Sequence, residues 1–305
     1  MQRTIDDHRA RFESEGFRVT LPQVSGQQLS EREMRDVVPG VDGLIVGDDE
    51  ITRPVLEKAD RLRVISKWGI GIDNIDLATA GELGILVTNT PGVFDDEVAD
   101  VVIGYAVLLA RQLHAVDDAV RRGEWAKPTG LSLAGRTMGV VGLGHIGRAV
   151  ARRARAMRMR VIGTDVTPGQ AAEASAEGVE IVDIATVLRK SDIVSLNCPL
   201  TEENWHMVDA AALAAMQPGA FLINTARGPL VDEIALVEAL SGGHLGGAAL
   251  DVYESEPLPA ESPLRALDNV ILGSHNGSNT VEAVRRTSTL AIDNLLAGLR
   301  SSDVG

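Results

Sequence analysis

The chain has 305 residues, of which 45% are hydrophobic, which is enough for two domains of ordinary size with filled cores. Its formal net charge is −14, and because the basic residues are interspersed with acids, nucleic acid is not an expected partner. The single cysteine, Cys198, excludes an intrachain disulfide, and without a Cys/His cluster we expect no metal. No apolar run approaches the length of a membrane span and the N-terminus has no signal-peptide core, so we expect a cytoplasmic protein that spans no membrane.

The first ninety residues or so alternate short helices with short strands. Helices are expected over residues 5–15, 29–38, 53–58 and 75–81, and strands over residues 17–21, 43–46, 63–66 and 85–88. The first helix has Thr4 as a candidate N-cap and Gly16 just past its end, while Ser30 and Glu33 stand in capping-box spacing. Alternation of this kind predicts a parallel α/β sheet.

One long helix is predicted next, over residues 95–122, with Gly123 ending it. A helix of this length braces two domains or forms a subunit contact. Packing within one domain would explain it equally well.

Residues 138–165 follow the order strand, glycine turn, helix, strand, acid of a dinucleotide-binding unit. Gly142 permits the tight turn, Gly144 lets a pyrophosphate approach the backbone, and Gly147 lets the helix pack close to the strand. The helix N-terminus offers N–H groups and a positive dipole end to the phosphates. Asp165 would accept both ribose hydroxyls of the adenosine and repel a 2′-phosphate, so we expect NAD as the cofactor. A chance glycine cluster is the alternative, and both strands and the acid argue against it.

The rest of the chain continues the same alternation. Strands are expected over residues 179–182, 193–196, 221–224, 248–251 and 270–272, and helices over 184–190, 210–216, 233–241 and about 280–299. They complete a doubly wound sheet, whose ligands should lie at the C-terminal ends of the strands. The apolar face of the last helix can pack on the first domain. We therefore expect a discontinuous substrate domain of residues 1–93 and 278–305, into which a nucleotide domain of residues 94–277 is inserted.

Three polar residues stand after successive strands of the second domain, where a nicotinamide would lie. Arg227 would grip a substrate carboxylate as a fork, and His275 would exchange a proton with the oxygen of the reacting carbon. Glu256 would hold the other ring nitrogen of the histidine. Each residue alone is more often structural, but together, behind a nucleotide motif, they indicate hydride transfer to a 2-keto acid. The other histidines lie on remote helices, in the phosphate turn or in connecting segments: His8, His114, His145, His206 and His244.

A series of motifs covers nearly the whole chain in one order. They are KWGIGIDNID at 67–76, VTNTPG at 87–92, VAD at 98–100, the turn at Gly142, CPLT at 198–201, NTARG at 224–228, LDVYESEP at 250–257 and SHNG at 274–277. In these motifs the chain resembles the D-isomer-specific 2-hydroxyacid dehydrogenase family, and most of all its branch related to phosphoglycerate dehydrogenase.

The resemblance implies roles for particular residues. Arg227, Glu256 and His275 match the catalytic residues of the family, and Asp251 matches a residue that contacts the nicotinamide amide. The matching loop of residues 67–71 binds the substrate carboxylate through its backbone N–H groups; its residues are Lys67, Trp68, Gly69, Ile70 and Gly71. Further cofactor contacts are expected at His145, Ile146, Cys198, Pro199, Asn204, Thr225, Ala226 and Gly277. The implied fold has two flavodoxin-like or Rossmann-like α/β domains with doubly wound parallel sheets that close on a cleft. The implied assembly is a homodimer through the nucleotide domain.

The chain also departs from the family pattern. Asp48 stands where phosphoglycerate dehydrogenases tend to carry a basic residue for the substrate phosphate, although Lys67 and Arg53 are candidates to meet a second anionic group. Trp68 should narrow the pocket, and Asn204 replaces a common threonine. The family usually opens with a further strand before the first helix, which indicates either a different start site or a reduced first sheet. We expect no C-terminal regulatory domain.

Three functions follow. The leading hypothesis is an NAD-dependent oxidoreductase of a small anionic 2-hydroxy acid or 2-keto acid. The second keeps this chemistry on a phosphonate or another phosphorus oxyanion. The third is an NAD-sensing binding protein, which would have no need for Arg227, Glu256 and His275 together.

Overall fold

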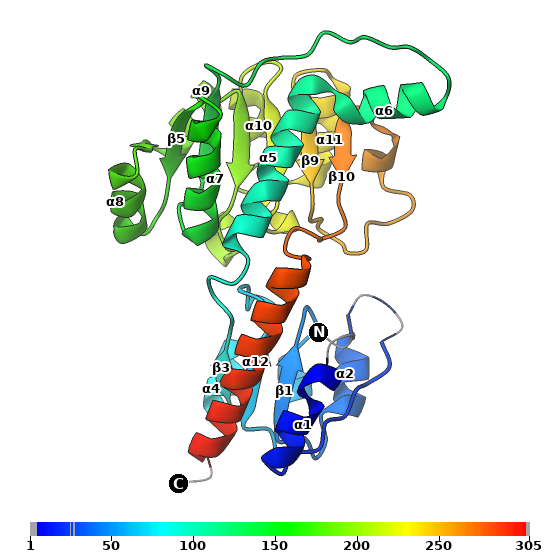
Figure 1. Cartoon of the computed structure of the whole chain (residues 1–305), viewed down its shortest axis with the longest axis vertical. Coiled ribbons are helices and arrows are strands. Elements are labelled where there is room, and N and C mark those ends of the chain that lie inside the picture. The colour runs from blue at the N-terminus through cyan, green and yellow to red at the C-terminus, as the bar shows by residue number, and fades with distance from the viewer. Residues whose placement is uncertain (1–4, 25, 27, 303–305) are drawn as a thin grey trace. The chain divides into compact units, whose positions relative to one another are not determined.

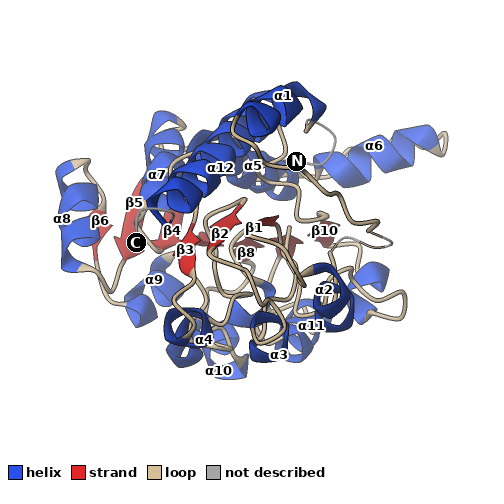
Figure 2. Cartoon of the chain, turned by 90° about the horizontal axis from the view of Figure 1, so that it is seen from below, coloured by secondary structure: helices blue, strands red, loops and turns tan. Residues whose placement is uncertain are grey.

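The computed structural model describes residues 5–24, 26 and 28–302 of the chain (Figure 1). The chain divides into two compact units. Unit 1 is formed by Met1–Val93 and Asn279–Gly305, and unit 2 by Phe94–Ser278. Each unit has its own parallel sheet with helices on both faces (Figure 2).

Unit 1 has a three-stranded parallel sheet in the order β1-β2-β3. Its strands are β1 (Gly43–Val46), β2 (Val64–Lys67) and β3 (Leu86–Thr88), and its helices are α1 (Asp6–Ser14), α2 (Glu31–Val37), α3 (Arg53–Leu56), α4 (Leu77–Glu82) and α12 (Val281–Ser302). Successive strand residues face opposite sides of the sheet. Leu44 belongs to the core under α2, α3 and α4, whereas Ile45 packs against the core under α1 and α12. The alternation expected from the sequence therefore builds two cores, one on each face.

Two local expectations for unit 1 have clear outcomes. The capping box of Ser30 and Glu33 is present at the start of α2. The strand predicted over residues 17–21 is wrong, because these residues pair with no strand in the part of the chain that the structure describes. Phe17 and Val19 instead pack against the core under α1 and α12, so their apolar spacing reflects packing without backbone pairing. Thr4, the candidate N-cap of the first helix, lies outside the described residues.

Unit 2 has a seven-stranded parallel sheet in the order β10-β9-β8-β7-β4-β5-β6. Its strands are β4 (Thr137–Val141), β5 (Arg160–Thr164), β6 (Glu180–Ile181), β7 (Ile193–Leu196), β8 (Phe221–Asn224), β9 (Gly247–Leu250) and β10 (Val270–Leu272). The chain runs outward from β4 in both directions, so the C-terminal ends of β4 and β7 flank the switch point at which such sheets bind ligands. Within this centre, Val140 lies opposite Gly163 of β5 and Ser195 of β7.

Helices cover both faces of the unit 2 sheet. They are α5 (Asp95–Arg111), α6 (Leu113–Arg121), α7 (His145–Ala156), α8 (Pro168–Ala176), α9 (Ile184–Lys190), α10 (Ala210–Ala215) and α11 (Glu233–Ser241), with 3-10 turns η2 (Glu202–Asn204), η3 (Gly228–Leu230) and η4 (Pro263–Ala266). Residues of α5, α7 and α8 share one core, and residues of α9, α10 and α11 share the other. This is the predicted doubly wound fold.

Two helix predictions for unit 2 need correction. The single helix expected over residues 95–122 is two helices, α5 and α6, bent by 66° about Gln112, whose φ of 51° lies in the left-handed region. A residue in that conformation interrupts the α-helical backbone, and periodicity alone does not reveal it. Helix α8 was not predicted. Within the described residues no single helix is long and apolar enough to cross a membrane, and α5 and α6 reach that length and composition only as this bent pair.

Candidate active site

The glycine turn between β4 and α7 has no room for side chains at two positions. An ideal Cβ on Gly142, whose φ is 89°, would lie 2.6 Å from the backbone nitrogen of Cys198, and one on Gly147 would lie 1.9 Å from the carbonyl oxygen of Gly142. At Gly144, in contrast, no described atom lies within 4 Å of the ideal Cβ. Gly144 is the N-cap of α7, and no described side chain caps this helix. The turn thus leaves an open, uncapped helix N-terminus, which fits the pyrophosphate of a dinucleotide.

Asp165 lies just past the end of β5, beside this turn. Its carboxylate accepts hydrogen bonds from the backbone N–H of Leu143 (2.6 Å) and of Thr167 (2.7 Å). A backbone hydrogen bond therefore ties the turn to the acid. His145 and Ile146 begin α7, and His145 Nδ1 lies 3.5 Å from Asp95 Oδ2. Burial raises the pKa of the Asp95 carboxyl.

The segment after β7 forms the other side of the turn. The backbone of Cys198 is in contact with Gly142, and burial raises the pKa of the Cys198 thiol to about 11. Pro199 follows, and its carbonyl accepts a hydrogen bond from Asn204 Nδ2 (2.8 Å). Asn204 Oδ1 also accepts from the backbone N–H of Thr201 (2.8 Å). The Asn204 side chain therefore holds its own loop closed. The sequence indicated only a cofactor contact for this residue.

The end of β8 presents a buried hydroxyl. Thr225 Oγ1 is buried and makes no hydrogen bond to any part of the chain that the structure describes. Buried polar atoms without a partner are rare, and a ligand or a water molecule satisfies them. Next to it, Asn224 Oδ1 accepts from the backbone N–H of Ala226 (3.0 Å), and Asn224 Nδ2 donates to the Arg227 carbonyl (2.8 Å). The buried asparagine thus shapes the loop that carries Arg227.

Glu256 and His275 form a direct pair. His275 Nδ1 lies 2.7 Å from Glu256 Oε2, and because a carboxylate only accepts, we assign the ring proton to Nδ1. The other oxygen, Glu256 Oε1, accepts from the backbone N–H of Tyr253 (3.0 Å). The side chains of His275 and Glu256 are 28% and 18% exposed, so the pair is largely shielded from solvent. The pairing predicted from the sequence is present.

Asp251 organises the turn that carries His275. Its buried carboxylate accepts from the backbone N–H groups of Asn276 (3.1 Å) and Gly277 (2.7 Å), and its carbonyl accepts from the His275 N–H (2.6 Å). Tyr105 of α5 donates its hydroxyl to the same carboxylate (3.4 Å). Burial, followed by the charge of Asp251, raises the pKa of Tyr105. Sequence reasoning missed Tyr105, because its place in the apolar repeat of the helix indicates packing and gives no sign of the distant Asp251 carboxylate that its hydroxyl meets.

Arg227 precedes η3, at the C-terminal end of β8. Its guanidinium donates from Nη1 to the Ala226 carbonyl (2.8 Å), and the side chain is half-buried. An ideal Cβ on the next residue, Gly228, would lie 1.8 Å from the carbonyl carbon of Tyr253. The loop of Arg227 therefore abuts the loop of Glu256, and unit 2 brings the three predicted catalytic residues to the ends of β8, β9 and β10.

The predicted substrate loop lies in unit 1 at the C-terminal end of β2, whose last residue is Lys67. The Lys67 side chain is 3% exposed, and its ammonium contacts the Gly47 carbonyl and lies 2.9 Å from Asp48 Oδ1. Trp68 Nε1 donates to Ser288 Oγ (3.1 Å). These contacts hold the first half of the loop and leave Lys67 neutralised within unit 1.

The second half of the loop is held by two polar side chains. The Gly69 N–H donates to Thr90 Oγ1 (2.9 Å), and the Ile70 carbonyl accepts from Asn89 Nδ2 (2.7 Å). Gly71 follows as a half-buried residue of the same loop.

Arg53, the other cation proposed to meet a second anion, is also paired. It lies 3.1 Å from Glu82 and 3.7 Å from Glu57. Both cations considered for a second anionic group, Lys67 and Arg53, are therefore paired with carboxylates of unit 1.

Comparison with known proteins decides the family. The family model described as D-isomer specific 2-hydroxyacid dehydrogenase, NAD binding domain, matches residues 103–277. A glyoxylate reductase of Thermofilum pendens is 43% identical over 258 residues, which cover 83% of this chain and 76% of the relative. The chain belongs to the D-isomer specific 2-hydroxyacid dehydrogenase family.

Two further proteins show how far the likeness extends. A D-3-phosphoglycerate dehydrogenase of Methanocaldococcus jannaschii is 40% identical over 277 residues, which are 89% of this chain and only 52% of that longer protein. The crystal structure of the TT0316 protein from Thermus thermophilus superposes with a TM-score of 0.87 at 38% identity, covering 98% of this chain and 94% of that chain.

Membership confirms several predictions. The protein is an NAD-dependent dehydrogenase that acts on the CH–OH group of hydroxy acids, by hydride transfer between NAD and a hydroxy or keto acid. The predicted family, fold class and cofactor are therefore confirmed. The homodimer and the cytoplasmic location stay predictions.

Proposed function

We propose that this dehydrogenase acts on a small 2-keto acid that carries a single anionic group, such as glyoxylate or hydroxypyruvate, and on the corresponding 2-hydroxy acid. In this proposal unit 2 binds NAD and supplies the acid–base pair, while residues 67–71 of unit 1 bind the substrate carboxylate. The contact between Glu256 and His275 is the observation that carries the proposal.

The three catalytic residues have separate tasks. Arg227 pairs with the substrate carboxylate and polarises the carbonyl, because a guanidinium presents two parallel donors. His275 gives its Nε2 proton to the carbonyl oxygen during reduction, and takes it back during oxidation. Glu256 keeps the other ring proton on Nδ1 and stabilises the charged imidazole. NAD, when bound, supplies or accepts the hydride.

Cofactor binding is assigned to the turn and the strand ends of unit 2. Gly144 and the first N–H groups of α7, including those of His145 and Ile146, would hold the pyrophosphate. Asp165 would accept the adenosine ribose hydroxyls, since its carboxylate keeps lone pairs beyond its two backbone bonds. The buried Thr225 hydroxyl would bond the cofactor at the end of β8. The remaining contacts are proposed at Gly142, Gly147, Cys198, Pro199, Asn204, Ala226, Asp251 and Gly277.

The preference for a single anionic group rests on Asp48. Its carboxylate lies 2.9 Å from the Lys67 ammonium, so this cation is neutralised, and a phosphate would meet a carboxylate in its place. Trp68 adds a large side chain, fixed by its bond to Ser288, to the proposed substrate loop. A small substrate matches both features, and the glyoxylate reductase among the relatives carries a name of this class.

The other two hypotheses have less support. A phosphonate substrate rests on the narrow pocket expected from Trp68 and on Lys67, and Asp48 neutralises the Lys67 charge. A binding protein without turnover would not need His275 paired with Glu256 beside the loop of Arg227.

A substrate panel tests the proposal. NADH oxidation is followed with glyoxylate, hydroxypyruvate, phosphohydroxypyruvate and a phosphonate aldehyde at equal concentrations. We expect kcat/KM to be at least about tenfold higher for the first two compounds, as one unfavourable buried charge contact is worth at least that factor. Preferred turnover of either phosphorus compound would overturn the substrate class. NADH binding without turnover of any keto acid would overturn the proposed function.

A further inference from the structure

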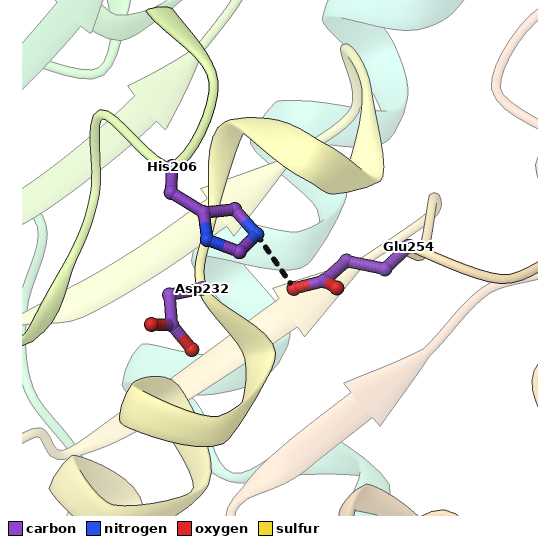
Figure 3. A group of neighbouring side chains, drawn as sticks. All are labelled: His206, Asp232 and Glu254. Carbon is purple, nitrogen blue, oxygen red and sulfur yellow. Dashed lines mark ion pairs between the residues drawn. The ribbon is translucent and has the colours of Figure 1, made fainter.

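We propose that His206 is a positioning residue, which acts through Glu254 to hold the loop of Glu256 in register with His275. Figure 3 shows His206, Asp232 and Glu254 converging from three separate segments of unit 2. The inference rests on the proposed roles of Glu256 and His275.

Glu254 is held from two directions. Its Oε1 lies 3.1 Å from His206 Nε2 and accepts a hydrogen bond from the Glu233 N–H (3.0 Å). The Glu254 N–H in turn donates to Glu233 Oε1 (2.7 Å). Both the backbone and the side chain of Glu254 are therefore fixed two residues before Glu256, within the same loop in which Tyr253 binds Glu256.

His206 is itself fixed by its backbone. The His206 N–H donates to the Pro229 carbonyl (2.8 Å), and the following residues form a parallel bridge, Val208 with Val231. Its φ of 52° lies in the left-handed region, which a residue with a side chain rarely adopts unless its surroundings impose it. The ring of Trp205 stacks on the imidazole with centroids 5.3 Å apart. The imidazole is thus a rigid partner for Glu254.

The backbone of Glu254 also contacts the loop of Arg227. An ideal Cβ on Gly228 would lie 2.4 Å from the Glu254 nitrogen, so the backbone after Arg227 runs directly against Glu254. A shift of Glu254 would therefore move both the loop of Arg227 and the loop of Glu256. Sub-ångström placement of acid–base and substrate-binding groups matters for rate, because misplacement by about 1 Å can lower it about 10²-fold.

The facing carboxylate of Glu254 favours the ring tautomer that carries an N–H at Nε2. Asp232 and Glu254 lie beside His206. Burial, with the charges of Glu254 and Glu256, raises the pKa of the neighbouring Glu233. His206 Nε2 is buried and makes no hydrogen bond of regular geometry within the described chain, yet it faces Glu254 Oε1. A lone pair on that nitrogen would repel the carboxylate, whereas an N–H attracts it.

A metal ion is the competing explanation. One ligand atom from each of His206, Asp232 and Glu254 lies within 4.8 Å of the others. However, Glu254 Oε1 already accepts from Glu233, and Asp232 Oδ1 already accepts from the Ala235 N–H as the N-cap of α11. These oxygens are engaged in protein hydrogen bonds, which favours the positioning role.

The test uses graded replacement of His206. His206→Ala removes the partner of Glu254, whereas His206→Gln keeps an N–H donor of similar reach. We expect His206→Ala to lower kcat with glyoxylate about tenfold while the KM for NADH changes less than about twofold, and His206→Gln to recover most of the loss. His244→Gln is the matched control, since His244 is a part-buried histidine that contacts the Leu213 carbonyl (3.1 Å) away from this loop. NADH fluorescence and thermal melting confirm that each variant is folded.

The outcomes separate the explanations. Full activity of His206→Ala, or no recovery in His206→Gln, would overturn the positioning role. Loss of wild-type activity on treatment with a chelator, restored by Zn²⁺, would replace it with a metal site. Glu256→Gln is measured alongside: if it keeps full kcat, the proposed catalytic roles fail, and if it loses activity while His206→Ala does not, only the positioning role fails.

Discussion

Single residues in this site are held mostly by backbone groups. Asp251 accepts hydrogen bonds from two backbone N–H groups and Glu256 accepts one. The backbone of the surrounding loops therefore orients each carboxylate. His275, in turn, has its N–H bound to the Asp251 carbonyl and its Nδ1 to Glu256. These two bonds fix the orientation of the ring, and the proposed proton transfer is assigned to Nε2.

Replacing His275 tests this assignment. His275→Ala should lower kcat at least ~10²-fold, the usual contribution of a positioned general acid–base group, and leave the Kd of NADH nearly unchanged. Steady-state kinetics with glyoxylate and fluorescence titration with NADH measure the two effects. A variant with the wild-type rate would remove His275 from the proton transfer.

Cys198 gives a second prediction at this scale. Burial raises its thiol pKa to about 11, so the nucleophilic thiolate is scarce at neutral pH. At about pH 8 alkylation by iodoacetamide should be about 100-fold slower than for a thiol of pKa about 9, and should rise roughly tenfold per pH unit up to about pH 10. Because Cys198 is the only cysteine, mass spectrometry of the intact chain reports on it alone. A fast reaction at the lower pH would contradict the buried environment.

At the scale of elements, the glycines of the turn between β4 and α7 serve two purposes: one is needed for packing, and the other is proposed to leave room for the cofactor. At Gly147 an ideal Cβ meets backbone, whereas at Gly144 it meets open space. Two glycines three residues apart therefore have different reasons for lacking a side chain.

The two alanine variants should show this difference. Gly147→Ala should destabilise unit 2 by about 1–3 kcal/mol, as an extra methyl in a packed site does. Gly144→Ala should leave the melting temperature within about 2 °C of wild type but weaken NADH binding, because its methyl would occupy the space proposed for the pyrophosphate. Thermal melts and NADH titrations of both variants check the pair. Equal destabilisation by both changes would show that the turn is closed at Gly144 as well.

At the scale of the whole molecule, the two units have separate sheets and separate cores. All residues proposed to hold NAD belong to unit 2, which includes the matched NAD binding domain. The cofactor should therefore stabilise one unit more than the other.

Hydrogen exchange can measure this asymmetry. At about 100 times its Kd, NADH should slow exchange in β4, β5 and α7 by up to about 100-fold, equivalent to ~2.7 kcal/mol of binding free energy. Strand β1 and helix α3 of unit 1 serve as the internal control and should change less. Equal protection of both units would show that NADH couples them without substrate.

The amino-acid sequence alone determined the features that depend on neighbouring residues. The glycine turn follows from local backbone preferences and spacing, and the strands follow from short apolar runs bounded by turns. The order of Arg227, Glu256 and His275 after successive strands predicted that they would meet at one edge. Parallel strands present their C-terminal ends together, so this meeting needed no knowledge of packing.

The tertiary structure decided the features that depend on contacts between distant segments. Three features arise from packing that no local pattern records. They are the bend at Gln112, the segment at residues 17–21 that pairs with no described strand, and the neutralisation of Lys67 by Asp48. The contact of His206 with Glu254 is of the same kind, since a histidine in a connecting segment gives no sign of the loop that it meets. Local preference is a property of a short stretch of chain, whereas a through-space contact exists only after the chain has folded.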